Sequence, residues 1–296
     1  MKAVQFSRFG GPEVLEIVEL PDPHAGAGEI RIKVRAAGIN ASDWKKRQGL
    51  MDPELPQTLG YEAAGVVDEL GDGVTGVALG DEVFGISPGG AAQSELAVLS
   101  FWAPVPPSLD FAGAAALPAA TETAARALDQ LGVTAGQTVL INGASGSVGG
   151  AAVQLAVGRG ARVIGTAGPA NQDYVRSLGA VPVVYGEHMV EQVASEKIDL
   201  ALDVAGSGVL PELIKLAGGA GNVLTVADFQ GAQQYGVRFS RGDSGRALYI
   251  LGELGDLIAA GRFSMPVGRT FPLADVAEAH RVGEAGRVRG KLVLTP

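Results

Sequence analysis

The residues best suited to chemistry lie in a glycine-rich turn that joins an apolar run to an alanine-rich segment. The run Val139–Ile141 predicts a strand, and the residues after the turn have helical spacing. Ala144, Gly146 and Gly149 stand in the pattern Ala-x-Gly-x-x-Gly, close to the Gly-x-Gly-x-x-Gly fingerprint of dinucleotide sites. Strand, turn and helix therefore follow one another in the order that a pyrophosphate site requires.

Each small residue of this turn suits such a site. Gly146 has no side chain to keep a pyrophosphate from the backbone, and Gly149 lets the helix pack close to its strand. Free amides at the start of the helix, aided by its dipole, would face the anion. A tight turn that binds nothing is the alternative. We predict cofactor contacts from Ala144, Ser145, Gly146, Ser147, Val148 and Gly149.

Composition narrows the class of protein. The 296 residues are enough for two domains, and a hydrophobic content of 47% can fill their cores. No apolar run approaches the ~18–20 residues that span a bilayer. The segment Met1–Phe6 is typical of a strand rather than a signal peptide, so we expect a cytoplasmic protein. A net charge of −9 argues against a general nucleic-acid binder.

Metal chemistry has few possible ligands here. The chain has no cysteine, which excludes disulfides, thiolate nucleophiles and cysteine-ligated zinc. Its histidines, His24, His188 and His280, lie far apart in sequence, and no pair has metal-ligand spacing. We expect each histidine to be a surface or structural residue, and we predict no metal.

The elements that must position the turn fall into two patterns. Before about residue 115, alternating or apolar runs separated by Gly, Pro and Asp predict a β-rich domain. From Thr121 onward, strands alternate with helices, which predicts βαβ units and a parallel sheet. The predicted strands of the first pattern are Met1–Arg8, Leu15–Leu20, Glu29–Ala36, Ala63–Glu69, Asp81–Ile86 and Ser94–Leu99. Those of the second are Thr138–Asn142, Arg162–Thr166, Val181–Tyr185, Ile198–Asp203 and Asn222–Val226.

Helices complete the second pattern, and the C-terminal part differs from it. We predict helices at Thr123–Leu131, after the turn, at Gln172–Leu178, at Met189–Glu196 and between the last two strands. A long helix at Ser244–Gly261, another at Leu273–Gly283 and a strand at Arg289–Thr295 follow. That strand is predicted to rejoin the first sheet. The result is a split domain, residues 1–118 plus 262–296, with a Rossmann domain at residues 119–261 inserted into it.

The strand after the fingerprint helix bears on the choice of nicotinamide cofactor. NAD sites usually place Asp or Glu about 20 residues beyond the fingerprint. Here the strand runs into Thr166, Ala167 and Gly168, and the first acid is Asp173. A carboxylate would repel a 2′-phosphate, so its absence favours NADPH over NADH. Tyr185, after the next strand, is within reach of the same site; ordinary turn residues are the alternative.

Six blocks along the chain together resemble the zinc-independent quinone oxidoreductase branch of the medium-chain dehydrogenase/reductase superfamily. They run in the family's order over nearly the whole chain. The blocks are Gly38–Asp43, Gly60–Val67, Gly80–Gly85, Leu117–Pro118 with Thr123, Gly136–Gly146 and Arg289–Leu294. The resemblance implies a GroES-like β domain that carries an inserted Rossmann domain, in agreement with the split domain above.

The resemblance also implies where metal would bind, and this chain departs from that pattern. Zinc-dependent relatives take their catalytic ligands from a Cys in the first block, a His in the second and a Cys before the Thr123 helix. Here Asn40, Tyr61 and Ala119 stand at those positions. Without a Lewis acid, the chemistry that fits is hydride transfer to an acceptor that is already electrophilic, such as a quinone or an α,β-unsaturated carbonyl.

The family places the residue matching Asn40 at the active site, where it would donate to a developing oxyanion or orient the nicotinamide. Tyr61 supplies a phenolic donor or is an interior aromatic. Thr123 resembles the threonine at the start of the helix near the nicotinamide, and Asp43 resembles a structural acid. We predict Asn40, Tyr61 and Thr123 as catalytic. Cofactor contacts outside the fingerprint are predicted for Asn40, Thr123, Thr166, Ala167, Gly168, Tyr185, Val204, Val226, Ala227, Arg287 and Arg289. Lys291 is a further C-terminal candidate, and a solvated basic run is the alternative for Arg287, Arg289 and Lys291.

The function predicted from these residues is an NADPH:quinone reductase without metal. An enoyl or enone reductase of specialised metabolism, or an NADPH-binding protein without turnover, are the alternatives. The family pairs Rossmann edge strands across a homodimer. The matching segment here, Gln230–Phe239, is polar and contains glycine, yet a homodimer is still expected.

Overall fold

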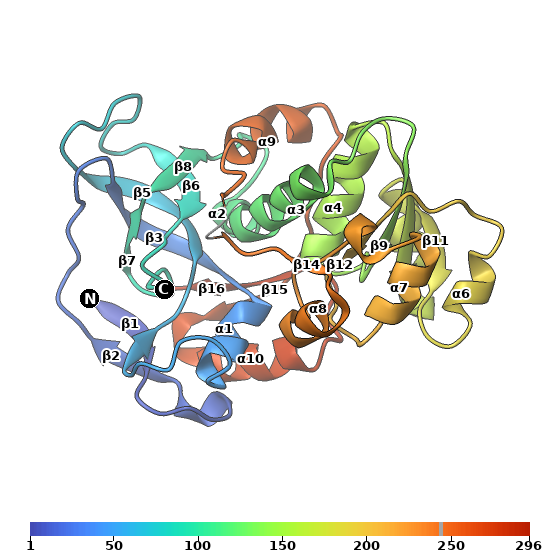
Figure 1. Ribbon diagram of the computed structural model, residues 1–296. Helices are drawn as coiled ribbons and strands as arrows, with labels where there is room; N and C mark the ends of the chain where they lie inside the picture. The colour runs from blue at the N-terminus through green and yellow to red at the C-terminus, as the bar shows by residue number, and fades with distance from the viewer. Residues whose placement is uncertain (243–244) are drawn as a thin grey trace. The chain divides into compact units, whose positions relative to one another are not determined.

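The computed structural model describes residues 1–242 and 245–296. These residues divide into two compact units. The first comprises Met1–Ala119, Leu251–Ala259 and Met265–Pro296, and the second Ala120–Ile250 with Ala260–Ser264. Both the N-terminal segment and the C-terminal segment Met265–Pro296 thus belong to the first unit, and most of the second unit is one continuous segment between them (Figure 1). The segment Leu251–Ala259 groups with the first unit, whereas the predicted boundary places residues up to 261 in the second.

The second unit is built on a parallel sheet. Its order is β11-β10-β9-β12-β13-β14, and every neighbouring pair is parallel. Numbered along the chain, this is 3-2-1-4-5-6, the Rossmann order, which confirms the predicted fold class. The strands are β9 (Thr138–Asn142), β10 (Arg162–Ala167), β11 (Val181–Val184), β12 (Leu200–Asp203), β13 (Val223–Thr225) and β14 (Arg238–Phe239).

Helices cover this sheet because its central strands are apolar on both faces. In β9 and β12, Leu140 and Ala201 are fully buried; they pack with Leu210 and Leu213 of one helix in a single cluster. The helices of this part of the chain are α3 (Pro118–Leu131), α4 (Ser147–Gly158), α5 (Gln172–Ser177), α6 (Met189–Gln192), α7 (Leu210–Leu216) and α8 (Phe229–Tyr235), with short 3-10 turns at Pro169–Asn171 and Ala220–Asn222.

The first unit is mainly β. One sheet has the order β15-β16-β3-β5-β6-β8, with β7 also paired to β3, and a second has the order β2-β1-β4. The strands are β1 (Lys2–Phe6), β2 (Glu16–Glu19), β3 (Ile30–Ile39), β4 (Gln57–Thr58), β5 (Glu62–Leu70), β6 (Glu82–Ile86), β7 (Leu96–Leu99), β8 (Phe101–Pro104), β15 (Val267–Pro272) and β16 (Lys291–Thr295). The remaining helices are α1 (Ala41–Arg47), α2 (Phe111–Ala115), α9 (Ile250–Ala259) and α10 (Val276–Glu284), with 3-10 turns at Pro12–Val14 and Leu273–Asp275.

The last strand of the chain pairs with an N-terminal strand in this unit. Strand β16 runs antiparallel to β3 with Leu292 opposite Ile39, and the two lie side by side in Figure 1. The prediction that the last strand rejoins the first sheet is confirmed. This pairing also brings the start of β16 next to the end of β3, where α1 begins.

Several predicted elements were wrong in extent. The long helix at Ser244–Gly261 is limited to α9; Ser244 lies outside the described residues, and Gly245 has φ +104°, which a right-handed helix cannot include. The helix Met189–Glu196 ends at Gln192, because the chain continues in i→i−3 turns. The segment Gln230–Phe239 is mostly α8, followed by the two-residue edge strand β14.

Other elements were missed because their local patterns are weak. Strand β15 is exposed along most of its length and ends in proline, so it shows no alternation. Strand β4 has two residues, and α2 has five. Within residues 1–242 and 245–296, no helix combines the length and the apolar character needed to cross a bilayer.

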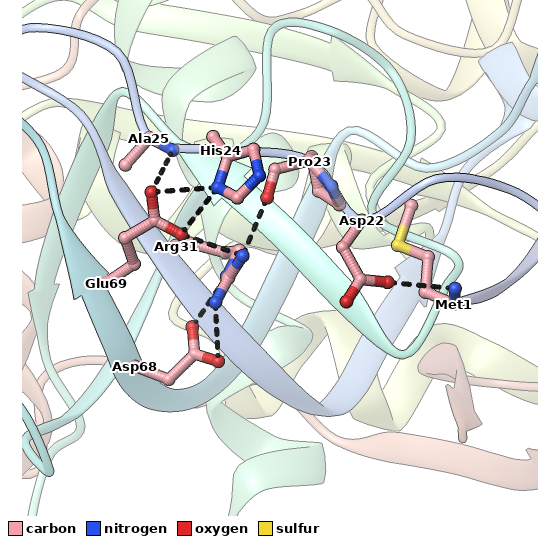
Figure 2. A network of polar contacts seen from close by, with 8 residues as sticks. All are labelled: Met1, Asp22, Pro23, His24, Ala25, Arg31, Asp68 and Glu69. Atoms are coloured by element: carbon pink, nitrogen blue, oxygen red, sulfur yellow. Dashed lines mark hydrogen bonds and ion pairs between the residues drawn. The ribbon is translucent and has the colours of Figure 1, made fainter.

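A polar network ties the segment before β3 to the first sheet (Figure 2). Arg31 forms an ion pair with Asp68 at 2.9 Å and with Glu69 at 2.7 Å, and it donates to the carbonyl of Pro23 at 2.8 Å. His24 lies 3.2 Å from Glu69 and is exposed. The structure thus places His24 among surface contacts, as predicted.

His280 is a buried structural residue of α10. The Arg47 guanidinium lies 3.2 Å from its Nδ1, and a guanidinium can only donate, so the ring proton is on Nε2. Arg47 also binds Glu284 and donates to the carbonyl of Gly10. Burial, and to a lesser extent the charge of Arg47, lowers the pKa of His280 to about 3. The ring therefore stays neutral at physiological pH.

This burial predicts a pH-dependent contribution to stability. Between pH 6.5 and about 3 the unfolded chain binds a proton at His280 that the folded chain does not. The free energy of unfolding should therefore decrease as pH falls through this window, by up to about 1.4 kcal/mol per pH unit. His280→Gln, which still offers Arg47 an acceptor, should flatten the dependence of Tm on pH between 4 and 6.5.

The matched control is His188→Gln at an exposed position of the second unit. It reports the effect of losing a histidine without losing a buried one. Equal pH slopes for wild type and His280→Gln would contradict the assignment of a neutral buried ring.

Candidate cofactor and active site

The fingerprint turn connects β9 to α4. Gly143 has φ +90°, a left-handed conformation that favours glycine, and Gly146 is the N-cap of α4 in an extended conformation. A Cβ placed on Gly146 would meet one atom within 4 Å, the carbonyl oxygen of Gly143 at 3.5 Å. A Cβ on Gly149 would lie 2.1 Å from the same oxygen. Gly149 is thus required for packing, while the protein leaves space above Gly146.

The start of α4 offers backbone donors to an anion. Gly150 N–H makes the first bond of the helix, to the Gly146 carbonyl at 2.7 Å, and no side chain caps the N-terminus. The amides of Ser147, Val148 and Gly149 precede that bond and have no partner inside the helix. Together with the dipole of this 12-residue helix they form a site of the kind that binds diphosphates. The residues present therefore fit a dinucleotide.

A buried network of hydrogen bonds anchors the fingerprint turn to the ends of the neighbouring strands. The Asp203 carboxylate at the end of β12 accepts from Asn142 Nδ2 at 2.9 Å and from Thr225 Oγ1 at 2.7 Å. Thr166 Oγ1 donates to Asn142 Oδ1 at 2.7 Å and accepts from Gly143 N–H at 3.0 Å. Four adjacent parallel strands are thus joined at the edge where their carboxyl ends meet, and the turn is anchored to them.

The predicted cofactor residues of this unit fall into two groups. Thr166, Ala144 and Ala167 are buried, so the Thr166 hydroxyl supports the turn through Gly143. Tyr185 is 61% exposed and close to Gly168, whose added Cβ would lie 3.5 Å from the phenol oxygen. Along the same edge, Gly143 approaches Val204, and Gly206 approaches Ala227. Each predicted contact with cofactor stays a prediction.

The remaining predicted residues lie on other elements or directly after β13. Thr123 is a partly exposed residue of α3 in the second unit. Val226 follows β13, and its N–H donates to the Asp203 carbonyl. Arg287 and Arg289 are exposed, between α10 and β16 of the first unit.

In the first unit, a second cluster forms around Glu62, whose side chain is 0% exposed. Glu62 Oε1 accepts from Asn40 Nδ2 at 2.8 Å and pairs with Lys291 Nζ at 2.6 Å. Lys291 Nζ also donates to Asn40 Oδ1 at 2.5 Å, and Ala119 N–H donates to Glu62 Oε2 at 2.7 Å. Asn40 and Ala119, two positions of zinc ligands in the resembled relatives, thus share one carboxylate.

Asp43 holds the loop that carries Asn40. Its carboxylate accepts from the Asn40 N–H at 2.7 Å, from Gly60 N–H at 3.3 Å and from Gln93 Nε2 at 3.3 Å. Burial raises the pKa of Asp43 to about 7, against the opposing effects of the Asn40 hydrogen bond and the Lys291 charge. These contacts agree with its predicted structural role.

Tyr61, the third of these positions, lies next to Glu62 in the chain and is partly exposed. Lys46 Nζ is 5.8 Å from the centre of its ring and donates to the Thr58 carbonyl at 3.1 Å. Burial lowers the pKa of Lys46, while the nearby Asp43 and Asp52 act to raise it. A cation and a phenol thus border the Asn40 cluster.

Sequence reasoning missed Glu62 and Asp203 as centres of these clusters. The available signal was an acid at the start or end of an otherwise apolar strand, since such an acid must find partners when the strand is buried. Among the described residues, no group of three or more His, Cys, Asp and Glu side chains is arranged to hold a metal ion.

A parallel sheet of Rossmann order with a dinucleotide turn, together with a β-rich unit, defines a dinucleotide-dependent oxidoreductase fold. Comparison with known proteins agrees. Residues 26–114 match the alcohol dehydrogenase GroES-like domain, and residues 178–294 match the family described as zinc-binding dehydrogenase. The chain belongs to the medium-chain dehydrogenase/reductase superfamily, and its relatives include quinone oxidoreductases.

The chain is 34% identical to the quinone oxidoreductase of Sus scrofa, over 99% of this chain and 97% of that protein. It is 31% identical to 2-methylene-furan-3-one reductase of Solanum lycopersicum, over 100% of this chain and 79% of that protein. It is 36% identical over 97% of its length to the spectinabilin polyketide synthase system protein NorB of Streptomyces orinoci, of which it spans only 14%. The structure of Escherichia coli quinone oxidoreductase complexed with NADPH is similar over the full length of both chains, with a TM-score of 0.88 and 27% identity.

The two glycines of the turn give a matched pair of variants. Gly146→Val should fold with a Tm close to wild type, because a Cβ at this position meets no close contact and φ is an ordinary −77°. It should lose NADPH binding, because the side chain occupies the space for the pyrophosphate. Gly149→Ala should instead lower Tm by several degrees, because its Cβ collides with a backbone carbonyl.

Calorimetric titration with NADPH and thermal unfolding measure the two effects separately. Wild-type affinity in a folded Gly146→Val variant would refute the assignment of this turn to the cofactor.

Proposed function

We propose that this oxidoreductase transfers hydride from NADPH to quinones or other activated, carbonyl-conjugated acceptors without a metal. The observation that carries the proposal is the Asn40 amide, fixed between Glu62 and Lys291 at a position where zinc-dependent relatives have a ligand. An amide N–H is a hydrogen-bond donor, suited to an acceptor that needs its oxygen stabilised rather than strongly polarised.

The second unit would hold the cofactor. The amides at the start of α4 bind its diphosphate, and the space above Gly146 admits it. Bound there, the reduced nicotinamide supplies a hydride. The end of β10 leads to Gly168 with the exposed Tyr185 beside it, and Asp173 is engaged by Arg176. The absence of a carboxylate at the end of β10 favours NADPH, and the NADPH complex of the E. coli enzyme supports the same choice.

The first unit would act on the acceptor. One N–H of Asn40 is committed to Glu62, and the second would donate to the oxygen that gains charge as hydride arrives. Such a donor contributes roughly 3–4 kcal/mol, and holding the reactants in place contributes on the order of 7–11 kcal/mol. Resonance in a quinone spreads the developing charge, so these contributions suffice without a strong acid.

A metal-free mechanism is supported by the donor set of this site. Asn40, Tyr61 and Ala119 offer an amide, a phenol and a methyl group, none of which is a usual zinc ligand. The carboxylate between them, Glu62, is already neutralised by Lys291. We therefore propose that the description of the family as zinc-binding does not extend to this chain.

Saturation of an activated C=C bond is a second candidate. The similarity to 2-methylene-furan-3-one reductase favours it, and the same amide would stabilise an enolate oxygen. A cofactor-binding protein without turnover remains the alternative from another class. We also propose a homodimer; the parallel sheet ends in the short strand β14, which provides an edge for pairing.

The first prediction for this function is oxidation of NADPH, followed at 340 nm, by protein freed of metal with chelator. We expect turnover with 1,4-benzoquinone, a 1,2-quinone or a simple enone, and a lower kcat/KM with NADH. Turnover of the enone alone would favour the second candidate. NADPH binding without turnover of any acceptor would refute the reductase proposal, and equal kcat/KM for both cofactors would refute the NADPH preference.

The second prediction concerns Asn40 directly. Asn40→Ala should lower kcat by about 100-fold, since it removes a donor to the developing oxyanion. NADPH affinity should be largely kept, because the fingerprint is intact. Unchanged kcat in the variant would remove Asn40 from the mechanism.

A further inference from the structure

We infer that Lys291 is a positioning residue, which together with Glu62 holds the Asn40 carboxamide in the single orientation that can donate to an acceptor. The inference rests on the proposed function and extends it to a residue whose ammonium binds the side chain that would meet the acceptor. Lys291 was a candidate for contact with a ligand from its place in the sequence. In the structure its side chain is 2% exposed, with the ammonium directed at Glu62 and Asn40.

Strand pairing places Lys291 there. Leu292 of β16 is opposite Ile39 of β3, so the preceding residue of β16 lies beside Asn40, where β3 ends. Glu62 begins β5, the strand that pairs with β3 on its other side. Three adjacent strands therefore deliver an ammonium, an amide and a carboxylate to one buried point.

The chemistry of these groups allows one arrangement. A lysine ammonium only donates hydrogen bonds, and an ionised carboxylate only accepts them. The Asn40 oxygen must therefore face Lys291, at 2.5 Å, and its nitrogen must face Glu62, at 2.8 Å. A flipped amide would set oxygen against carboxylate and N–H against ammonium. The second N–H of Asn40 is thereby given one direction.

The Lys291 ammonium also neutralises the charge of the Glu62 carboxylate. Glu62 is completely buried, and an unpaired buried carboxylate is strongly unfavourable. Asp43 stands nearby as a second carboxyl group, and the Lys291 charge acts to lower its pKa while Glu62 acts to raise it. Loss of Lys291 thus has two separable effects: a buried charge without its partner, and an amide free to turn.

Two variants separate these effects. Lys291→Met keeps the length of the side chain but removes charge and donor, so it should lower both Tm and kcat, the latter about 10- to 100-fold. Adding Glu62→Gln removes the uncompensated charge. We expect the double variant Lys291→Met/Glu62→Gln to recover most of the lost Tm while kcat stays low, because the ammonium and the carboxylate that fix the orientation of the Asn40 amide are then both absent. Lys33→Met, an exposed lysine of β3, is the matched control and should behave as wild type.

The orientation itself is measured without any acceptor. In 15N-labelled protein, the Asn40 side-chain NH2 signals, identified by their loss in Asn40→Ala, should be sharp and well separated in wild type. In the double variant they should broaden or converge. Joint recovery of Tm and kcat, or unchanged Asn40 signals, would overturn the inference. If wild type turns over no acceptor while the NH2 signals respond as expected, the proposed function fails and the positioning of Asn40 stands.

Discussion

The burial of Glu62 constrains the assembly of the first unit. A fully buried carboxylate needs donors, and each donor comes from a different segment: Asn40 after β3, Lys291 at the start of β16, and the Ala119 amide in the first turn of α3. Removing one partner of such a pair typically costs about 3–5 kcal/mol. The carboxylate therefore fixes the start of β16, the residue before α1 and Ala119 with respect to one another.

A buried acid has the same effect in the second unit, at the edge where the strands of the parallel sheet end. Asp203 is buried at the end of β12 and collects the side chains of Asn142 and Thr225 as well as the amides of Ala205 and Gly206. Strand order reverses between β9 and β12, and ligands of open α/β sheets bind outside that point. The polar network thus rigidifies the backbone that presents the amides of α4. In both units, a buried acid at a terminus of an apolar strand gathers the polar groups of several neighbouring segments.

The features that could be predicted from the sequence are those formed by residues adjacent along the chain. The β9–turn–α4 segment was recognised because strand, glycines and helix are contiguous, and the packing role of Gly149 follows from its place in that pattern. The direction of a side chain near a strand end is a different problem. Thr166 was predicted as a cofactor contact, which stays a prediction, but the local pattern did not show that its hydroxyl donates to Asn142. The Lys291–Asn40 contact joins residues 251 positions apart, so no local pattern in the sequence predicts it.

The contacts of Asn40 also limit the chemistry that the first unit can perform. Its oxygen accepts from an ammonium, which draws electron density from the amide and strengthens its N–H groups as donors. Its committed N–H donates to a carboxylate, which partly offsets that effect. The result is a neutral donor of fixed direction, weaker than a divalent cation. Such a donor suits quinones and enones, whose conjugation spreads the charge that hydride transfer brings to oxygen. The cluster of Glu62, Lys291 and Asn40 therefore supports the class of acceptor that we propose for this site.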